Sequence, residues 1–129
     1  MTRPLLVVDA ANVVGSVPDG WWRDRFGAAE RLRDSLVPFA TSGLDGFAPG
    51  PLEIVLVVEG KARDVASVPG VRVVSAPGSG DDAMVDLVRA EGVDRMCAVV
   101  TADRELRRRV TEFGASVMGP TSVRGNHRR

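Results

Sequence analysis

Histidine and cysteine are almost absent from the sequence. The one histidine, His127, lies at the C-terminal end, so a Ser-His-Asp triad is excluded, and so are most zinc sites. The one cysteine, Cys97, excludes an internal disulfide, and its place in an apolar run predicts an inert core thiol. Because chains without disulfides are typical of a reducing compartment, we expect a cytoplasmic protein.

Long apolar runs are also absent. No run approaches the roughly 20 residues that span a bilayer, so we expect no membrane partner. The first four residues lead directly into an apolar stretch, which leaves no room for a signal peptide. No Gly-x-Gly-x-x-Gly pattern follows that stretch, and a dinucleotide site is therefore not expected.

Charge is balanced in number but not in position. The sequence has 17 basic and 17 acidic residues, yet from Arg104 to the end 7 arginines stand against 2 glutamates. Such a segment can attract a polyanion although the whole chain is neutral. Arg104, Arg107 and Arg108 are therefore predicted to contact a nucleic-acid backbone, with a solvated helix face as the alternative.

Short apolar runs rich in β-branched residues alternate with helical patterns along the chain. Strands buried on both faces have this composition, and their alternation with helices predicts an α/β fold with a mainly parallel sheet. Five strands in the order 3-2-1-4-5 satisfy the rule of right-handed crossovers. The predicted strands are residues 5–8, 52–58, 71–74, 96–100 and 116–118, and the predicted helices are residues 28–37, 81–91 and 103–113.

Turn residues mark the limits of the elements. Pro38 is expected to end the first helix, and residues 41–51 are predicted to form a flexible loop. Phe113 falls at helical spacing from earlier apolar residues and is expected in the core. One domain is predicted over residues 1–120, followed by a basic, disordered tail over residues 121–129.

Carboxylates stand where the predicted strands end or the helices begin. Asp9 and Asp103 follow neighbouring strands, so they and the other acids are expected to converge on one crevice. Clustered carboxylates repel one another unless a cation joins them, and Mg²⁺ or Mn²⁺ suits such ligands. Phosphodiester hydrolysis is the chemistry that fits best. Simple capping of a turn or helix is the alternative for each acid. The acids that are expected to converge on the crevice with Asp9 and Asp103 are Glu59, Asp81 and Asp82.

Asn12 and two adjacent tryptophans are further candidates. Asn12 is predicted either to orient Asp9 and a metal-bound water or only to permit a turn. Trp21 and Trp22 are suited to stacking on bases, and Trp22 is our candidate for RNA contact. The alternative for the tryptophans is that they anchor the start of a helix against the core.

Three segments together resemble a known family. Residues 7–13 (VVDAANV), 80–85 (GDDAMV) and 100–104 (VTADR) are similar to the three signatures of NYN-domain proteins of the PIN-like nuclease superfamily, most of all its YacP-like branch. The resemblance covers roughly residues 5–120. It implies a Rossmann-like PIN fold and an endoribonuclease that cleaves RNA with Mg²⁺ or Mn²⁺ held by clustered aspartates.

The resemblance also assigns roles. Asp9, Asp82 and Asp103 match the family's catalytic and metal-binding aspartates, and Asp82 is preferred to Asp81 because its spacing to Val85 fits the family pattern. The further metal ligands and supporting residues that it implies are Asp81, Asp86, Asn12, Glu59 and Thr101. Two alternatives stay open, a non-catalytic RNA-binding module of the same fold and a nucleotide phosphohydrolase. The oligomeric state is also open, with a homodimer as one alternative.

Overall fold

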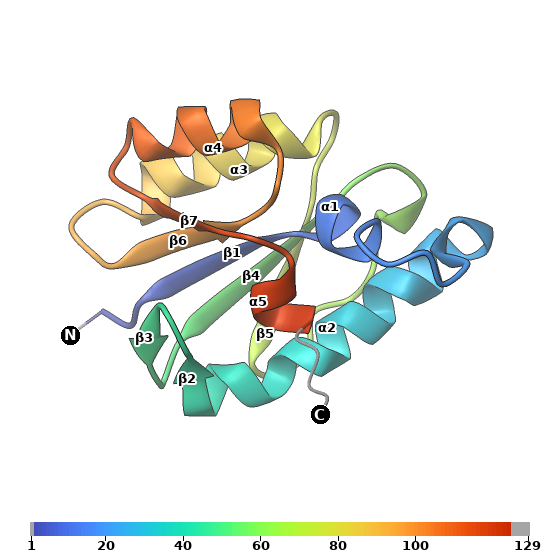
Figure 1. Ribbon diagram of the computed structural model, residues 1–129, viewed down its shortest axis with the longest axis horizontal. Helices are drawn as coiled ribbons and strands as arrows, with labels where there is room; N and C mark the ends of the chain where they lie inside the picture. The colour runs from blue at the N-terminus through green and yellow to red at the C-terminus, as the bar shows by residue number, and fades with distance from the viewer. Residues whose placement is uncertain (1, 125–129) are drawn as a thin grey trace.

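A parallel five-stranded sheet forms the centre of the molecule in a computed structural model, which describes residues 2–124 (Figure 1). Its spatial order is β5-β4-β1-β6-β7. Counted along the chain without the small separate hairpin, this is the predicted order 3-2-1-4-5, which is therefore confirmed. The strands are β1 (Leu5–Asp9), β4 (Glu53–Val58), β5 (Val71–Ser75), β6 (Cys97–Val100) and β7 (Ser116–Met118).

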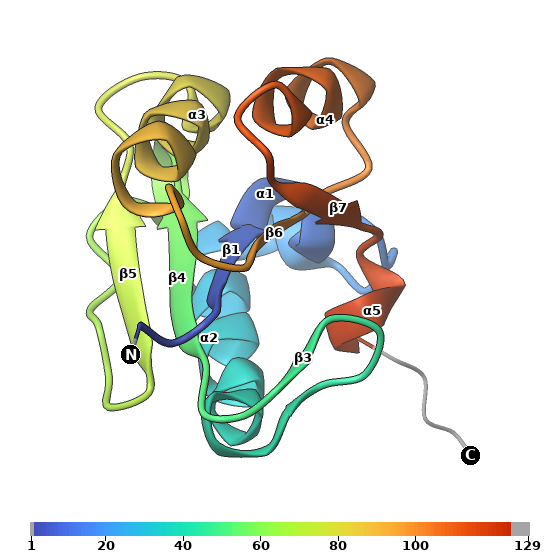
Figure 2. The same ribbon diagram turned by 90° about the vertical axis from the view of Figure 1, so that its left-hand side faces the viewer.

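Helices cover both faces of the sheet, as Figure 2 shows. The helices α1 (Ala10–Val14) and α2 (Arg25–Ser42) lie on one face, and α3 (Gly80–Glu91) and α4 (Arg104–Thr111) lie on the other. Along β1, Leu6 and Val8 join the core under α2, whereas Leu5 and Val7 join the core under α3 and α4. This two-sided burial explains why the strands are continuous apolar runs.

Strand register places polar residues together at one edge of the sheet. The pairing of β1 with β6 ends at Val8 and Val100, so Asp9 and Thr101 are the next residues on two neighbouring strands. Asp9 still pairs with Val57 of β4, two residues before Glu59. Because α1 and α4 begin within a few residues of these strand ends, their N-termini lie at the same edge.

The first long helix is longer than predicted. It runs through Pro38 to Ser42, where the sequence was expected to stop it. Pro38 is exposed, and the extra turn packs Phe39 and Ala40 against the core. Ser42 also donates a hydrogen bond from Oγ to the Pro38 carbonyl, 3.0 Å away. Packing of that last turn outweighs the one helical hydrogen bond that a proline removes.

Five short elements before β5 were not predicted. Helix α1 lies in a segment expected to be a loop, and the hairpin β2 (Gly43–Leu44) and β3 (Ala48–Pro49) lies in the expected loop 41–51. Two 3₁₀ turns, η1 (Trp21–Arg23) and η2 (Gly60–Ala62), complete the connections. Leu44 and Ala48 of the hairpin are buried, so this segment belongs to the core and is not a free loop.

Two expectations for the C-terminal part are wrong. Helix α4 ends at Thr111, and Phe113 lies beyond it with 42% of its surface exposed instead of in the core. Residues 121–124 form helix α5 (Thr121–Arg124), and Val123 packs in the core under α2. The rest of the expected tail, residues 125–129, lies outside the described residues. Cys97 is buried, and burial raises its pKa to about 11, in keeping with an inert thiol.

Candidate active site

Asp9 is a buried carboxylate at the carboxyl end of β1, with only 5% of its surface exposed. The Thr101 hydroxyl donates a hydrogen bond to its Oδ2 at 2.8 Å, and the Asn12 amide donates to its Oδ1 at 3.3 Å. The second contact makes Asp9 the N-cap of α1, so the capping alternative is part of its role. These two bonds fix the orientation of the carboxylate.

Burial raises the pKa of Asp9 from 3.8 to about 6. The hydrogen bonds from Thr101 and Asn12 act in the opposite direction, and the negative charges of Asp81 and Glu59 raise the pKa further. The groups that act on Asp9 within the described residues include no basic side chain. Its ionised form is therefore uncompensated, which is the electrostatic condition of a cation site.

Thr101 and Asn12 join the loop after β6 to the start of α1. Thr101 Oγ1 accepts a hydrogen bond from the Asp103 amide at 3.1 Å, while its own proton goes to Asp9. The Asn12 side-chain oxygen accepts from the Ala102 amide at 2.9 Å. Two of the three residues that were expected to support the site, Asn12 and Thr101, therefore hold the segment of Ala102 and Asp103 beside Asp9.

Asp103 is the N-cap of α4. Its Oδ1 accepts a hydrogen bond from the Leu106 amide at 2.9 Å. Its Oδ2 has no hydrogen bond within residues 2–124. Capping therefore uses one oxygen of this half-buried carboxylate and leaves the other open.

Glu59 follows β4 and contacts the first residue of α3. Its Oε1 accepts a hydrogen bond from the Gly80 amide at 2.9 Å. A Cβ atom at position 80 would lie 2.1 Å from that oxygen, so a larger residue there would displace the Glu59 carboxylate from the helix start. This contact between residues 21 positions apart brings the first turn of α3 to the acidic edge.

Asp81, not Asp82, is the member of the doublet that faces the other acids. Burial and the charges of Asp103 and Glu59 raise the pKa of Asp81, and its charge in turn raises the pKa of Asp9. The side chain of Asp82 is 71% exposed and forms an ion pair with Arg109 at 3.0 Å. The expectation that Asp82 lies with Asp9 and Asp103 is therefore corrected in favour of Asp81.

Asp86 also lies apart from this group. It forms an ion pair with Arg89 at 2.8 Å on the exposed side of α3. Four carboxylates are hereafter called the acidic cluster: Asp9, Glu59, Asp81 and Asp103. The charge of Asp81 acts on Asp9, and the charges of Glu59 and Asp103 act on Asp81; Asp82 also raises the pKa of Asp81, from outside the cluster.

The arginines of α4 differ in what they contact. Arg108 is held between Glu105 and Glu112, at 2.5 and 2.8 Å, so its predicted contact with a nucleic acid would require breaking these pairs. The side chains of Arg104 and Arg107 form no hydrogen bond or ion pair within the described part of the chain, and the Nε atom of Arg107 is buried without a partner. Arg109, which sequence reasoning did not single out, pairs with Asp82 and lowers the pKa of Asp81.

The two tryptophans have different surroundings. Trp22 is 50% exposed and packs edge-on against Trp21, with ring centroids 5.9 Å apart. Trp21 is half-buried, packs against the core and lines a pocket that also contains Glu59. Trp21 therefore lies next to the acidic cluster, whereas the exposed Trp22 was the predicted contact.

The acidic cluster fits a divalent cation in the chemistry of its donors. Within residues 2–124, neither carboxylate oxygen of Asp81 has a hydrogen bond or an ion pair. Glu59 Oε2 has no hydrogen bond or ion pair within these residues either. Over the same residues, no three Asp, Glu, His or Cys side chains are gathered closely enough to enclose an ion. Mg²⁺ usually keeps several waters and takes one or two carboxylates directly. The donors therefore suit a hydrated cation better than a closed protein cage.

Comparison with known proteins addresses the fold. No family model matches the sequence, and no curated protein matches it. A crystal structure of Rae1 (YacP) from Bacillus subtilis superimposes with a TM-score of 0.72 at 17% identity, covering 92% of this chain and 70% of that chain. A mutant of the same protein gives a TM-score of 0.74 at 16% identity, covering 93% and 72%. Within residues 2–124, no helix is long and apolar enough to cross a membrane. The chain has the YacP-like, PIN/NYN-type α/β fold that its three motifs predicted.

Proposed function

We propose that this protein is an Mg²⁺- or Mn²⁺-dependent endoribonuclease that hydrolyses RNA phosphodiester bonds at the acidic cluster. The observation that carries the proposal is the burial of Asp9 as a carboxylate whose pKa is raised to about 6 and which no basic side chain compensates. Perturbed carboxylates of this kind concentrate at functional sites. The resemblance of the three motifs to NYN-domain proteins, and the fold shared with Rae1 (YacP), support the same activity.

Asp9, Asp81 and Asp103 are the residues that would hold the cation, and Glu59 would complete their surroundings. When bound, Mg²⁺ or Mn²⁺ supplies stabilisation of the negative charge that develops on the phosphate and lowers the pKa of the attacking water. Thr101 and Asn12 keep Asp9 and Asp103 in place by the hydrogen bonds described above. This fixed arrangement avoids reorganisation during the reaction.

A carboxylate of the cluster has to accept the proton of the attacking water. The described residues 2–124 contain no histidine, and a positioned carboxylate can act as a general base. Arg104 and Arg107 follow Asp103 directly on α4 and are without side-chain partners in the described part of the chain. They are suited to contact the phosphates on either side of the scissile bond.

The second candidate is a non-catalytic RNA-binding module. One observation favours it, namely that no three potential ligands within residues 2–124 are gathered for one ion. The test is incubation of the purified protein with labelled single-stranded and structured RNA in Mg²⁺, Mn²⁺ or EDTA, with Asp103→Asn as the comparison. The nuclease predicts cleavage that needs the metal and that Asp103→Asn abolishes. If the parent protein binds RNA but does not cut it with either metal, the binding module is correct.

A further inference from the structure

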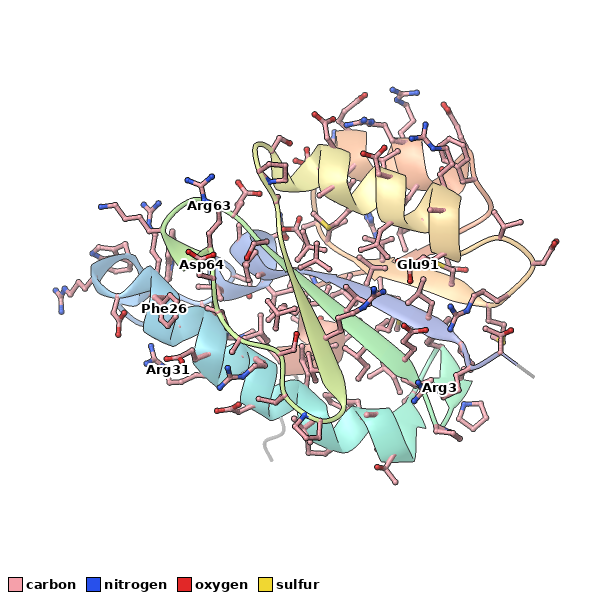
Figure 3. The ribbon with its side chains drawn as sticks, turned by 180° about the vertical axis from the view of Figure 1, so that it is seen from behind. Arg3, Phe26, Arg31, Arg63, Asp64 and Glu91 are labelled. Atoms are coloured by element: carbon pink, nitrogen blue, oxygen red, sulfur yellow. The ribbon has the colours of Figure 1, made fainter. Side chains whose placement is uncertain are left out.

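A pocket of about 170 Å³ opens directly beside the acidic cluster. Glu59 belongs to both, and Ala10 and Ala11, which line the pocket, follow Asp9 in the chain. On the other side lies the start of α2, next to the η2 turn. Figure 3 shows the loop of Arg63 and Asp64, which follows η2, beside the first turns of α2. The pocket is thus a continuation of the site and not a separate hollow.

Trp21 forms one wall of this pocket and is held in place. Its ring packs edge-on against Trp22, and the guanidinium of Arg25 lies 5.4 Å from its centroid. Arg25 is exposed and lines the pocket as well. The Arg25 guanidinium therefore lies over the Trp21 ring, and both residues line the pocket together with Glu59.

The rest of the lining is small and apolar. Ala10, Ala11 and Ala62 line the pocket together with Trp21, and Glu59 and Arg25 are the charged side chains among the described residues that line it. A flat ligand with a π-face fits such a space, because aromatic side chains and arginine planes are the groups on which unpaired bases stack. A phosphate bound next to that base would lie between Arg25 and the acidic cluster.

We infer that this pocket binds one unpaired nucleobase of an RNA strand, with the adjacent phosphate at the acidic cluster. The inference rests on the proposed function for the chemistry at that phosphate, but not for the binding of the base. A paired base cannot turn away from its helix without breaking its pairing, so the pocket selects single-stranded RNA.

The experiment uses the fluorescence of Trp21 in a protein that carries Trp22→Phe, and Asp103→Asn keeps the RNA intact in Mn²⁺. A short single-stranded RNA is compared with the same RNA lacking the base at one position in turn. We expect quenching of Trp21, and one position at which loss of the base weakens binding roughly 5- to 100-fold. Loss of a base at the other positions has a smaller effect.

Two variants test the pocket itself. Trp21→Ala removes the aromatic ring that lines the pocket. Ala62→Leu places a larger side chain in the pocket from a partly buried position and leaves Trp21 unchanged in the sequence. Both should weaken binding of the complete RNA to the level of the abasic RNA, as measured by filter binding, because Trp21→Ala removes the fluorophore. Phe26→Ala is the control, since Phe26 is an exposed aromatic on α2 that does not line the pocket, and it should leave binding unchanged (Figure 3).

The outcomes separate this inference from the proposed function. If every abasic RNA binds as tightly as the complete one, or Ala62→Leu folds normally and binds RNA like the parent, the pocket does not hold a base, whether or not RNA is cut. If the parent never cuts RNA, but removal of the base at one position and the substitution Ala62→Leu each weaken RNA binding, the pocket is supported and the nuclease proposal fails.

Discussion

Asp9→Asn is expected to stabilise the metal-free protein. The pKa of Asp9 is about 6 in the folded protein, against 3.8 as the ordinary value. Below about pH 4 the carboxyl group is protonated in both states and has no effect. As the pH rises towards 6, the unfolded chain loses this proton first, so the free energy of unfolding falls. Above that range the ionised Asp9 costs the folded protein about 3 kcal/mol, an order-of-magnitude figure.

Asparagine at position 9 removes the negative charge of Asp9 but keeps the size and shape of its side chain. The Thr101 hydroxyl and the Asn12 amide both donate to the present carboxylate, and asparagine offers one oxygen in place of two. Losing one of these bonds costs about 1 kcal/mol. The expected net gain is about 2 kcal/mol near pH 8, equivalent to a melting temperature higher by roughly 6 °C.

Denaturation in EDTA between about pH 4 and about pH 8, followed by circular dichroism, measures the difference in unfolding free energy between Asp9→Asn and the parent. The difference should grow from about pH 4 to about pH 6 and then stay constant. Asp45→Asn, in the exposed turn of the β2–β3 hairpin, is the control and should show no such rise. A variant that is less stable than the parent at high pH, or a difference independent of pH, would refute the reasoning and leave Asp9 as a structural cap.

Further predictions concern the cation, the two aspartates of α3, its first glycine and the arginines of α4. Mg²⁺ or Mn²⁺ at about 100 times its dissociation constant should stabilise the parent by about 2.7 kcal/mol in thermal melts, and Asp81→Asn should weaken this effect. In RNA cleavage assays, Asp81→Asn should reduce the rate on the order of 100-fold, while Asp82→Asn stays within about threefold; equal rates would overturn the choice of Asp81. Gly80→Ala should lower the unfolding free energy by about 1–3 kcal/mol, whereas Gly78→Ala, where a Cβ meets nothing within 4 Å, should not. Arg107→Ala should weaken RNA binding and reduce its salt dependence but spare the cleavage step, as filter binding at several salt concentrations and single-turnover rates will show.

The sheet could be predicted because its strands bury both faces. Leu5 to Val8 are fully buried, and such a strand leaves an apolar run that needs no structural context to recognise. The alternation of these runs with helices then predicted a parallel sheet, for which 3-2-1-4-5 is one of the common orders. The hairpin at residues 43–49 left no comparable signal, because each of its strands has two residues.

The choice between Asp81 and Asp82 could have been made from the sequence. At about 100° per residue, Asp81 falls on the same side of the helix as Met84, Val85 and Val88, which are buried. Asp82 falls outside that face. The family pattern favoured Asp82, but the amphipathic pattern of the helix itself indicated Asp81.

The contact between Glu59 and Gly80 could not have been predicted in the same way. The two residues are 21 positions apart, and neither has a local sequence pattern that indicates the contact. Only the packing of α3 against the sheet brings the Gly80 amide to the carboxylate. A Cβ at position 80 would meet Oε1, so the absence of that atom in glycine allows the contact.

The hydrogen bonds of the site favour a functional interpretation over a structural one. Hydrogen bonds connect Asp9, Thr101 and Asp103. In a purely structural network a basic side chain would neutralise the buried carboxylate, and the sequence has 17 basic residues. Within residues 2–124 no basic side chain is among the groups that shift the pKa of Asp9, and Arg109 pairs with the outer aspartate, Asp82. The fold thus keeps a destabilising charge at the edge of its sheet. A bound metal ion would supply the missing positive charge and so explain why the destabilising Asp9 carboxylate is kept. The pH dependence of the stability of Asp9→Asn is therefore the first measurement to make.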